Sequence, residues 1–513
     1  MAAITVASLV LSTCAGEPAR SPAPSPTAAA RAPEPAEDAS VALEGAGDAA
    51  ADVAAAAPGA AELGPEGACA ASRDCPGSGQ VLWAARFAIA GQSVSHQVGR
   101  ATYAIDLPSG SKLAAGGDGS VVVAAPHRGS IDVGGRILKA GVTSVLLVKL
   151  GGDGKPAWSA LIADPRSLTQ AIKDAKGVPQ QARVAGVGVD SRGEVVVAGE
   201  HSGGLQLRLA RPAKRSHSSN GFVSWHDGAS GTARTAFSYV DPLIMPSDLV
   251  VGAGDEVLLG ATEGVDVSTN QYDAAAVFFG RDGRETKRLR YGASGFYGGE
   301  AAFGGSGTAL VSGTVYVAPG YDGFLAALSG AKQPAWHLGL GGMMAPHIRV
   351  DSAGGLVLAG DFGARGAQLG ERLVAARGDA DVVVAWLRGE GRVVRVRHFG
   401  EPRAKASVSA LAVRPADRDF ALAGQLDAGG LELGASRVEH AARPSGFVAA
   451  FDPEGRARFS RRLTGASELR VEGVALDHTG NVFVSGFVEG DLGVGDQTFA
   501  GAGRALFVAK LSR

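Results

Sequence analysis

The sequence predicts an all-β fold built from repeated four-stranded units, and three observations carry this prediction. A strand–turn–strand pattern recurs about seven times between Lys112 and Arg513. An apolar, strand-like run follows each copy, and one further strand-like segment stands alone before the first copy. The 76 glycines in 513 residues suit many tight turns and disfavour a helical fold, because glycine destabilises helix interiors.

Each unit opens with two strands joined by a tight turn. In the clearest copy, residues 474–486, the strand positions are apolar and Asp477 to Asn481 supply the turn. The other copies of this hairpin lie at 117–123, 190–199, 254–260, 305–313, 351–360 and 417–424. The hairpin therefore forms the first half of each unit.

A third strand follows in each unit as a near-continuous apolar run. These runs lie at 144–148, 222–225, 276–279, 323–328, 382–386, 446–451 and 506–509. Runs without alternation indicate strands covered on both faces, as in sheets stacked on neighbouring sheets. We expect the tryptophans to belong to this core and not to a ligand cage. They are Trp83, Trp158, Trp225, Trp336 and Trp386.

The last unit stops at Arg513 after its third strand, and a candidate fourth strand lies at the other end of the chain. Residues 79–87 have the spacing of the fourth strand at 154–158, and no other strands precede them. We expect this segment to complete the last unit, because a closed ring protects its strand edges. Four strands per unit at a period of roughly 47–74 residues predict a seven-bladed β-propeller over residues 79–513.

The seventh unit carries a distinctive motif, Asp477-His478-Thr479-Gly480-Asn481-Val482-Phe483-Val484-Ser485-Gly486, followed by Phe507-Val508-Ala509-Lys510. This motif resembles the bacterial β-propeller repeat (SBBP-like). The resemblance covers residues 79–513, and the third, fourth and sixth units depart most from its Asp-x-x-Gly form. It implies the propeller fold and a place among secreted proteins and lipoproteins, and it implies no particular activity.

Residues 1–14 predict an export signal. Residues 4–10 are apolar but too few to span a bilayer, which takes about 20 residues in a helix. The following Leu11-Ser12-Thr13-Cys14 resembles the lipobox of a bacterial lipoprotein signal. This resemblance implies an acylated Cys14, with an ordinary secretory signal or an accidental apolar start as the alternatives. We therefore expect a lipid-anchored protein of the cell envelope, at the outer membrane or outside the cell.

Residues 15–68 predict a disordered tether, because they are rich in Ala and Pro and contain no aromatic residue. Such a segment cannot bury enough apolar surface to offset its ordering entropy. A segment bounded by cysteines, 69–78, follows. In an exported protein Cys69 and Cys75 are expected to form a disulfide, with two free thiols as the alternative. We expect no metal site there, since no other Cys or His stands nearby, and no cofactor.

Long connections on one face of a propeller are the expected place for binding residues. They are predicted at 125–142, 164–183, 200–220, 263–273, 361–381, 425–444 and 487–504. The connection at 200–220 carries the basic residues Arg208, Arg211, Lys214, Arg215 and His217. This group indicates either a contact with an acidic partner or a solvated surface loop. The flanking His201 and His226 do not by their spacing indicate a metal site.

The sequence contains no Gly-x-Ser-x-Gly elbow and no cysteine close to a histidine that would mark a nucleophile. The formal net charge of -2 disfavours nucleic acid as a partner. The favoured function is therefore a monomeric, non-enzymatic scaffold that binds a protein or a glycan. The alternative is a propeller enzyme, a lyase or a hydrolase, with a polar site at the mouth of the central channel. A purely structural envelope protein is the third possibility.

Overall fold

The structure, a computed structural model, describes residues 61–62, 78–90, 94–98, 101–105, 110–162, 182–201, 220–239, 243–266, 271–292, 295–317, 320–330, 333–414, 416–434 and 437–513. Contacts divide the chain into Met1–Ala56 and Ala57–Arg513, and all described residues belong to the second part. Cys14, Cys69, Cys75 and nearly all of the predicted tether lie outside the described residues. Within the described ranges, no helix has the length and apolar character needed to cross a membrane.

The described chain is all-β apart from a 3-10 turn, η2 (Gly305–Gly307). Its strands form successive sets of four that pair antiparallel in sequence order. The first strands are β5 (Lys112–Ala115), β9 (Ala182–Val189), β13 (Ile244–Val251), β17 (Phe296–Phe303), the second half of β20 (Trp336–Val350), β25 (Lys405–Val413) and β31 (Glu468–Leu476). The second strands are β6 (Val121–Val133), β10 (Val195–His201), β14 (Val257–Asp266), β18 (Ala309–Val317), β21 (Leu356–Leu369), β26 (Phe420–Ala428) and β32 (Val482–Glu489).

The outer half of each set consists of a third and a fourth strand. The third strands are β7 (Arg136–Leu150), β11 (Asn220–His226), β15 (Gln271–Phe279), β19 (Gly320–Leu328), β23 (Asp381–Arg388), β29 (Ser445–Phe451) and β35 (Arg504–Leu511). The fourth strands are β8 (Pro156–Ile162), β12 (Ala233–Tyr239), β16 (Glu285–Tyr291), the first half of β20, β24 (Arg392–Phe399), β30 (Ala457–Thr464) and β2 (Val81–Ala90). The remaining strands are β1 (Ala61–Glu62), β3 (Val94–Val98), β4 (Ala101–Ile105), β22 (Arg372–Val374), β27 (Gly430–Glu432), β28 (Arg437–Glu439), β33 (Leu492–Val494) and β34 (Gln497–Phe499).

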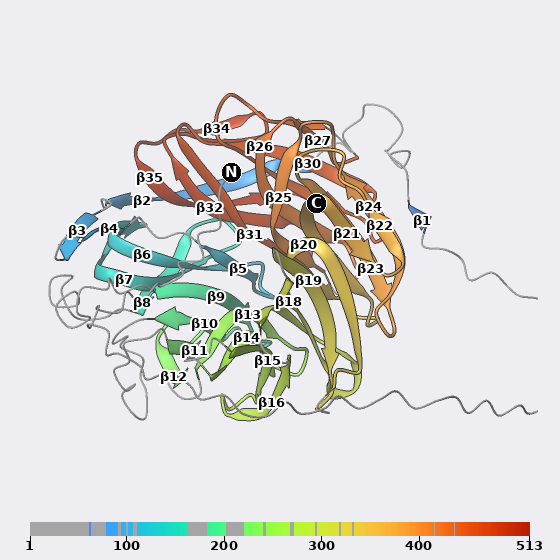
Figure 1. The fold of residues 1–513 in the computed structure, drawn as a ribbon. Coiled ribbons are helices and arrows are strands. Elements are labelled where there is room, and N and C mark those ends of the chain that lie inside the picture. Colours follow the sequence, from blue (N-terminus) through green and yellow to red (C-terminus); the bar gives the residue numbers. More distant parts are fainter. Residues whose placement is uncertain are drawn as a thin grey trace, which may run out of the picture. The chain divides into compact units, whose positions relative to one another are not determined.

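The amino-terminal strand β2 lies beside the carboxy-terminal strand β35 (Figure 1). Trp83 is paired with Lys510 in this antiparallel contact. Two separate chain segments replace the turn that joins the third and fourth strands elsewhere. The N–H of Gly79 donates to the Ser512 carbonyl at 2.9 Å, and the N–H of Ser512 donates to the Gln80 carbonyl at 2.8 Å. β2 thus takes the fourth-strand position in the set β31–β32–β35.

The first strands of successive sets contact one another. These contacts join β5 to β9, β9 to β13, β13 to β17, β17 to β20, β20 to β25, β25 to β31, and β31 to β5. Side chains on second strands also bond to the first strand of the next set. Examples are the N–H of Gly298 to Thr262 at 3.0 Å, Ser312 to the Pro346 carbonyl at 2.7 Å, the N–H of Val408 to Asp361 at 3.0 Å, and Ser485 to Ser111, the residue just before β5, at 3.0 Å. The last bond links the final set to the first.

In four sets the fifth residue of the second strand is a glycine that a phenylalanine ring of the third strand and a carbonyl oxygen of the first strand approach closely. In four sets it is paired with a phenylalanine of the third strand: Gly199 with Phe222, Gly313 with Phe324, Gly424 with Phe447, and Gly486 with Phe507. A Cβ atom at any of these glycines would clash with that ring and with a carbonyl oxygen of the first strand. The repeated glycine is therefore explained by packing.

Hydrophobic clusters lie between neighbouring sets. One cluster joins Val122 and Trp158 of the first set to Val195 and Phe222 of the second. All the tryptophans belong to such clusters, Trp158 and Trp225 as buried residues and the other three as partly buried ones. The prediction that they belong to the core is confirmed.

Several connections predicted as long loops contain β-hairpins, so the prediction is wrong for them. In place of the predicted loop 125–142, β6 continues to Val133 and β7 starts at Arg136. Hairpins built from β21–β22, β27–β28 and β33–β34 occupy most of 361–381, 425–444 and 487–504. Alternation explains the first case, because Ile131, Val133 and Leu138 turn one face of the hairpin into the core.

The third and sixth units keep the tight turn although they lack its usual glycine. Asp255 and Arg418 have φ angles of 62° and 67°. The equivalent positions in other units hold glycine, as in Gly193 at 80° and Gly480 at 91°. Residues with a Cβ atom are strained in this left-handed region, so the turn geometry is imposed by the paired strands on either side.

Candidate functional site

Four ionisable side chains from three neighbouring first strands meet at one place, and we call them the ionic cluster. They are Asp248 on β13, Glu300 on β17, and His347 and Arg349 on β20. Each strand has a β-bulge close to these residues. A bulge redirects neighbouring side chains, which explains how charged residues in largely apolar strands come to face one another.

Arg349 is the centre of the cluster. Its Nη1 lies 3.2 Å from Oδ2 of Asp248 and 2.5 Å from Oε2 of Glu300. The second oxygen of Glu300 lies 2.6 Å from Nδ1 of His347. Nε2 of His347 faces the carbonyl oxygen of Val408 at 3.2 Å. Backbone N–H groups of β17 and β20 add hydrogen bonds to both carboxylates, so the cluster connects three successive sets.

The cluster is largely shielded from solvent, since the Arg349 side chain is 27% exposed and that of Asp248 only 7%. Burial raises the pKa of Asp248 to about 6, although Arg349 opposes this shift. Burial acts in the same direction on Glu300, but the charges of Arg349 and His347 outweigh it and lower the pKa of that carboxyl. Asp248 is therefore the carboxyl of the pair that takes up a proton first as the pH falls.

Further charged groups stand on other strands, and two of them, Asp361 and Lys112, interact with the cluster through their charge. Asp361 on β21 accepts a hydrogen bond from β25, and burial raises its pKa to about 6. Glu472 on β31 accepts two backbone hydrogen bonds from the segment before β5, and burial still raises its pKa. Lys112 on β5 interacts through its charge with both carboxylates of the cluster. Charged groups thus stand on five of the first strands, β5, β13, β17, β20 and β31, and on the second strand β21.

The groups of the ionic cluster are bonded mainly to one another. Both ring nitrogens of His347 face oxygen atoms of the protein, and Arg349 donates hydrogen bonds to the carboxylates of Asp248 and Glu300. A general acid or base must reach a proton of its substrate, whereas these bonds are internal. Across the described ranges, no three or more His, Cys, Asp or Glu residues are grouped so as to hold a metal ion. The geometry is that of a stabilising ion network.

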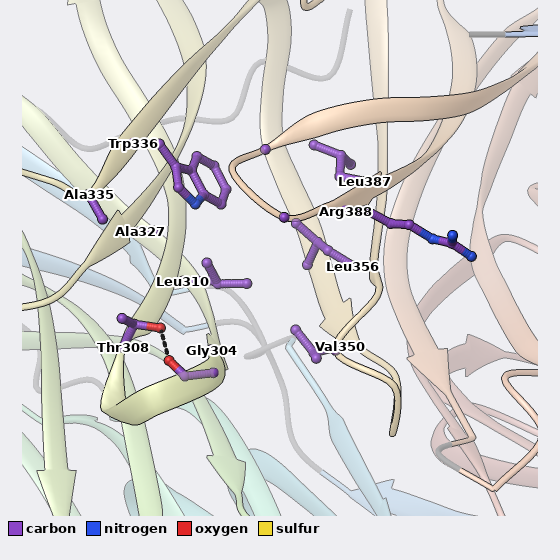
Figure 2. Close-up of a pocket in the computed structure, with 14 residues that line it drawn as sticks. Gly304, Thr308, Leu310, Ala327, Ala335, Trp336, Val350, Leu356, Leu387 and Arg388 are labelled. Carbon is purple, nitrogen blue, oxygen red and sulfur yellow. Dashed lines mark hydrogen bonds between the residues drawn. The ribbon is translucent and has the colours of Figure 1, made fainter. Parts of the chain in front are cut away.

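A pocket of about 330 Å³ lies on the opposite side from the long connections. It is bordered by tight turns of two neighbouring sets, β17 to β20 and β20 to β24, which share the strand β20. Figure 2 shows Trp336 on one wall, facing Leu310 and Leu356, with Arg388 extending away from the indole. The indole N–H of Trp336 has no hydrogen bond to the described chain, although Trp158 donates through Nε1 to a turn carbonyl of the next set at 2.9 Å. The pocket marks a place where two sets meet less closely.

A second pocket, of about 320 Å³, lies at the next boundary between sets, beside Trp386. The Arg395 guanidinium lies 5.5 Å from the centre of that indole ring and also donates to the Pro453 carbonyl at 3.2 Å. Both pockets are bordered by tight turns, whereas the sequence predicted binding residues on the long connections.

The predicted basic binding residues lie outside the described residues: Arg208, Arg211, Lys214, Arg215 and His217. The histidines that flank them lie at opposite ends of a strand pair, since His201 is paired with Asn220 and His226 with Val195. Six residues of extended strand separate these ends by roughly 20 Å. His201 and His226 therefore do not share a site.

Sequence reasoning missed the ionic cluster. The available signal was a charged residue at the same place in otherwise apolar first strands, as in Asp248, Glu300 and His347. The residues are separated by about 50 positions each, so only the bulged strands bring them together.

No family model matches this sequence, and no curated protein sequence matches it. Among solved structures, a protein of unknown function from Dyadobacter fermentans is similar at 11% identity and TM-score 0.37, over 83% of this chain and 98% of that chain. A leech intramolecular trans-sialidase is similar at 9% identity and TM-score 0.39, over 61% and 64%. A gluconolactonase, XC5397 from Xanthomonas campestris, is similar at 13% identity and TM-score 0.32, over 85% and 97%. No activity is inferred from these likenesses.

Proposed function

We propose that this chain is an exported, lipid-anchored β-propeller that serves as a non-enzymatic binding scaffold for a protein or a glycan at the cell envelope. In this proposal each four-stranded set is one of seven blades, and β2 closes the ring as the fourth strand of the last blade. The contacts between first strands support the ring, because they return from β31 to β5. The pairing of β2 with β35 supports its closure.

The observation that carries the non-enzymatic role is the internal bonding of the ionic cluster. First strands line the central channel of a propeller. A catalytic acid or base on a first strand would therefore meet its substrate in this channel. Here Arg349 and His347 are engaged by Glu300, and Arg349 also by Asp248. In this proposal the ionic cluster stabilises the blades, and residues on the outer surface of the protein bind the partner.

The envelope location rests on the amino-terminal sequence and on the resemblance to the bacterial propeller repeat. The lipobox-like Cys14 anchors the chain, the tether extends the propeller away from the membrane, and Cys69 and Cys75 form a disulfide in the oxidising environment. Mass spectrometry of the mature protein tests this part. We expect an acylated Cys14 and no free thiol at Cys69 or Cys75, and an unprocessed Met1 contradicts the anchor.

Titration of the purified full-length protein against solubilised envelope fractions tests the scaffold, with mass spectrometry of each bound component before and after incubation. We expect saturable binding, an unchanged component, and equal affinity for the Asp248→Asn variant. Turnover of a component by the parent protein but not by Asp248→Asn would overturn the proposal. Loss of binding without turnover in a folded variant would instead implicate the channel in recognition.

A hydrolase or lyase acting at the ionic cluster is the second candidate. The raised pKa of Asp248, at about 6, is the observation in its favour, because a carboxyl that titrates near neutral pH can exchange a proton with a substrate. The mass-spectrometric arm of the same titration decides between the two candidates.

A further inference from the structure

Four of the chain's seven tyrosines lie together, and we call them the tyrosine surface. They are Tyr272 on β15, Tyr297 on β17, Tyr316 on β18 and Tyr321 on β19. All four stand at strand ends next to the connections from second to third strand or from fourth to first strand. The surface therefore belongs to the face of the long connections, at a place where the link from Val317 to Gly320 is short.

The rings of the tyrosine surface form a row. Tyr272 and Tyr297 have ring centres 5.6 Å apart, Tyr297 and Tyr321 are 6.1 Å apart, and Tyr321 and Tyr316 are 5.3 Å apart. The last two are also cross-strand partners in β18 and β19. Paired strands hold the rings, so little side-chain freedom is lost when a ligand contacts them.

The row is accessible at one end. Tyr316 is 56% exposed, Tyr321 39% and the adjoining Val317 45%, while Tyr272 and Tyr297 are half-buried. In the described part of the chain, no residue forms a hydrogen bond with any of the four phenol oxygens. The pKa of Tyr297 is raised by burial and then by the phenols of Tyr321 and Tyr272, which agrees with three hydroxyl groups lying close together.

The charges beside the row neutralise each other. Arg365 Nη2 lies 2.5 Å from Oδ1 of Asp322, and it also donates to the carbonyl oxygen of Tyr321. The guanidinium is thus held by two acceptors of the same strand, β19, and is not presented as a free cation. A ligand of this surface is selected by ring contacts and hydroxyl groups, with little contribution from charge.

We propose that the tyrosine surface is a glycan-binding site that takes a neutral saccharide chain, an inference that rests on the proposed scaffold function. A saccharide presents apolar C–H faces that pack on aromatic rings and hydroxyl groups that bond to phenols. The exposed rings of Tyr316 and Tyr321 meet at 69°, so a sugar residue that packs on the face of one ring also touches the other. Tyrosine suits this contact because its ring is apolar and its hydroxyl is polar.

A protein partner is the competing occupant, since tyrosine is also common in protein interfaces. Stable protein interfaces bury about 800 Å² on each partner, which takes roughly 20–30 residues on each side. Here the exposed apolar residues at the site are few, namely Tyr316, Val317 and Tyr321. A narrow row of rings with free hydroxyls fits a chain of sugars better than a broad interface.

Affinity electrophoresis and calorimetric titration of the full-length protein with dextran, a β-1,3-glucan, xylan and a galactomannan test the inference. The double variant Tyr316→Ala/Tyr321→Ala removes the exposed rings, and Tyr297→Phe/Tyr321→Phe removes hydroxyls but keeps rings. Ile137→Ala and Leu373→Ala are matched controls, since both residues are 62% exposed and lie in other sets. Thermal unfolding verifies that every variant is folded.

We expect the parent to bind at least one neutral polysaccharide, with affinity lowered at least about tenfold in the alanine variant, less in the phenylalanine variant, and not in the controls. Equal polysaccharide binding by parent and alanine variant overturns the site, and so does binding of an envelope protein without any polysaccharide. In both cases the scaffold function stands. If the parent binds no polysaccharide and no envelope component, the scaffold function fails as well.

Discussion

The indole N–H of Trp83 donates a hydrogen bond of 2.9 Å to the carbonyl oxygen of Gly152. Trp83 stands on β2, in the last set, and Gly152 stands in a tight turn of the first set. The indole also packs against Phe483, with ring centres 6.0 Å apart. One side chain thus ties β2 to its own set and to the set that follows it.

Replacing Trp83 should therefore cost much more than replacing its neighbour. We expect Trp83→Ala to lower the free energy of unfolding by about 3 kcal/mol, because a large packed ring is lost, and Trp83→Phe by about 1 kcal/mol, because mainly the hydrogen bond is lost. Leu82→Ala, at a side chain that is 50% exposed, should change it by less than about 0.5 kcal/mol. Denaturant unfolding measures all three, and equal values for Trp83→Ala and Leu82→Ala contradict this role.

Two truncations test the role of β2 directly. Removal of residues 1–77 keeps β2 and the Gly79 and Gln80 contacts with Ser512, so the melting temperature should change little. Removal of residues 1–90 leaves the edge of β35 unpaired, and we expect a large fall in melting temperature together with aggregation. Similar melting of both truncated proteins would show that β2 does not support the fold.

Removing Glu300 should leave Arg349 and His347 without the partner that they share. We expect Glu300→Ala to lower the free energy of unfolding by about 3–5 kcal/mol, as for other broken buried ion pairs. The matched control is Glu454→Ala, because the pair of Glu454 and Arg456 is about half exposed and such pairs contribute about 0–1 kcal/mol. A loss for Glu300→Ala no larger than for the control means that the cluster is not a stabilising network.

Asp361 should make the protein less stable as the pH rises. Its folded pKa is about 6 and its reference pKa is 3.8, so between these values the folded protein keeps a proton that the unfolded chain has lost. Its contribution to stability therefore falls as the pH rises from about 4 to about 6. Compared with the parent, Asp361→Asn should lose less stability over this range, because the amide does not ionise while it can still accept the bond from Val408.

Asp477 provides the control of opposite sign. Hydrogen bonds from Thr479 and Asn481 outweigh burial and lower its pKa to about 2, so its contribution is lost as the pH falls below about 4. Asp477→Asn should alter the pH dependence only on this acid side. Unfolding curves at a series of pH values measure both effects, and a parent-like slope in Asp361→Asn between pH 4 and 6 contradicts the assignment to Asp361.

Arg418→Gly should stabilise the protein by about 1 kcal/mol. Arg418 is exposed and has a φ angle of 67°, where a side chain adds strain that glycine avoids. The control is Arg392→Gly in the strand β24, where glycine only adds freedom to the unfolded chain and should destabilise. A lower melting temperature for Arg418→Gly would show that the turn needs its side chain.

The strand pattern was predictable because it depends on contacts that the sequence repeats. Gly486 and Phe507 are cross-strand partners, and the same pair of residue types recurs in other units, so each copy supports the others. The hairpin of β6 and β7, and the hairpins in the same connection of three later units, were missed because their paired segments do not form continuous apolar runs. In the first unit the signal was the alternation of Ile131 and Val133.

The candidate sites depend on distances across the fold, which a repeat pattern does not encode. Glu300 and Arg349 lie 49 residues apart, and their meeting depends on how two bulged strands face each other. Tyr272 and Tyr297 likewise come from different sets. The concentration of tyrosine between residues 272 and 321 was visible in the sequence, but the alternation of strands alone did not indicate that four rings share one face.

The hydrogen bonds that join Gly79 and Gln80 to Ser512 have a consequence for the order in which the sheets form. Among the strands of the four-stranded sets, β2 is synthesised first and its partner β35 last, so the two cannot pair until all the other sets have been synthesised. During that time only Ile89 and Ala90 of β2 have a strand to pair with, β6, and the rest of its backbone groups lack a sheet. The set β31–β32–β35 receives its fourth strand only after β35 has been synthesised, and a chain without β35 loses the pairing that completes this set.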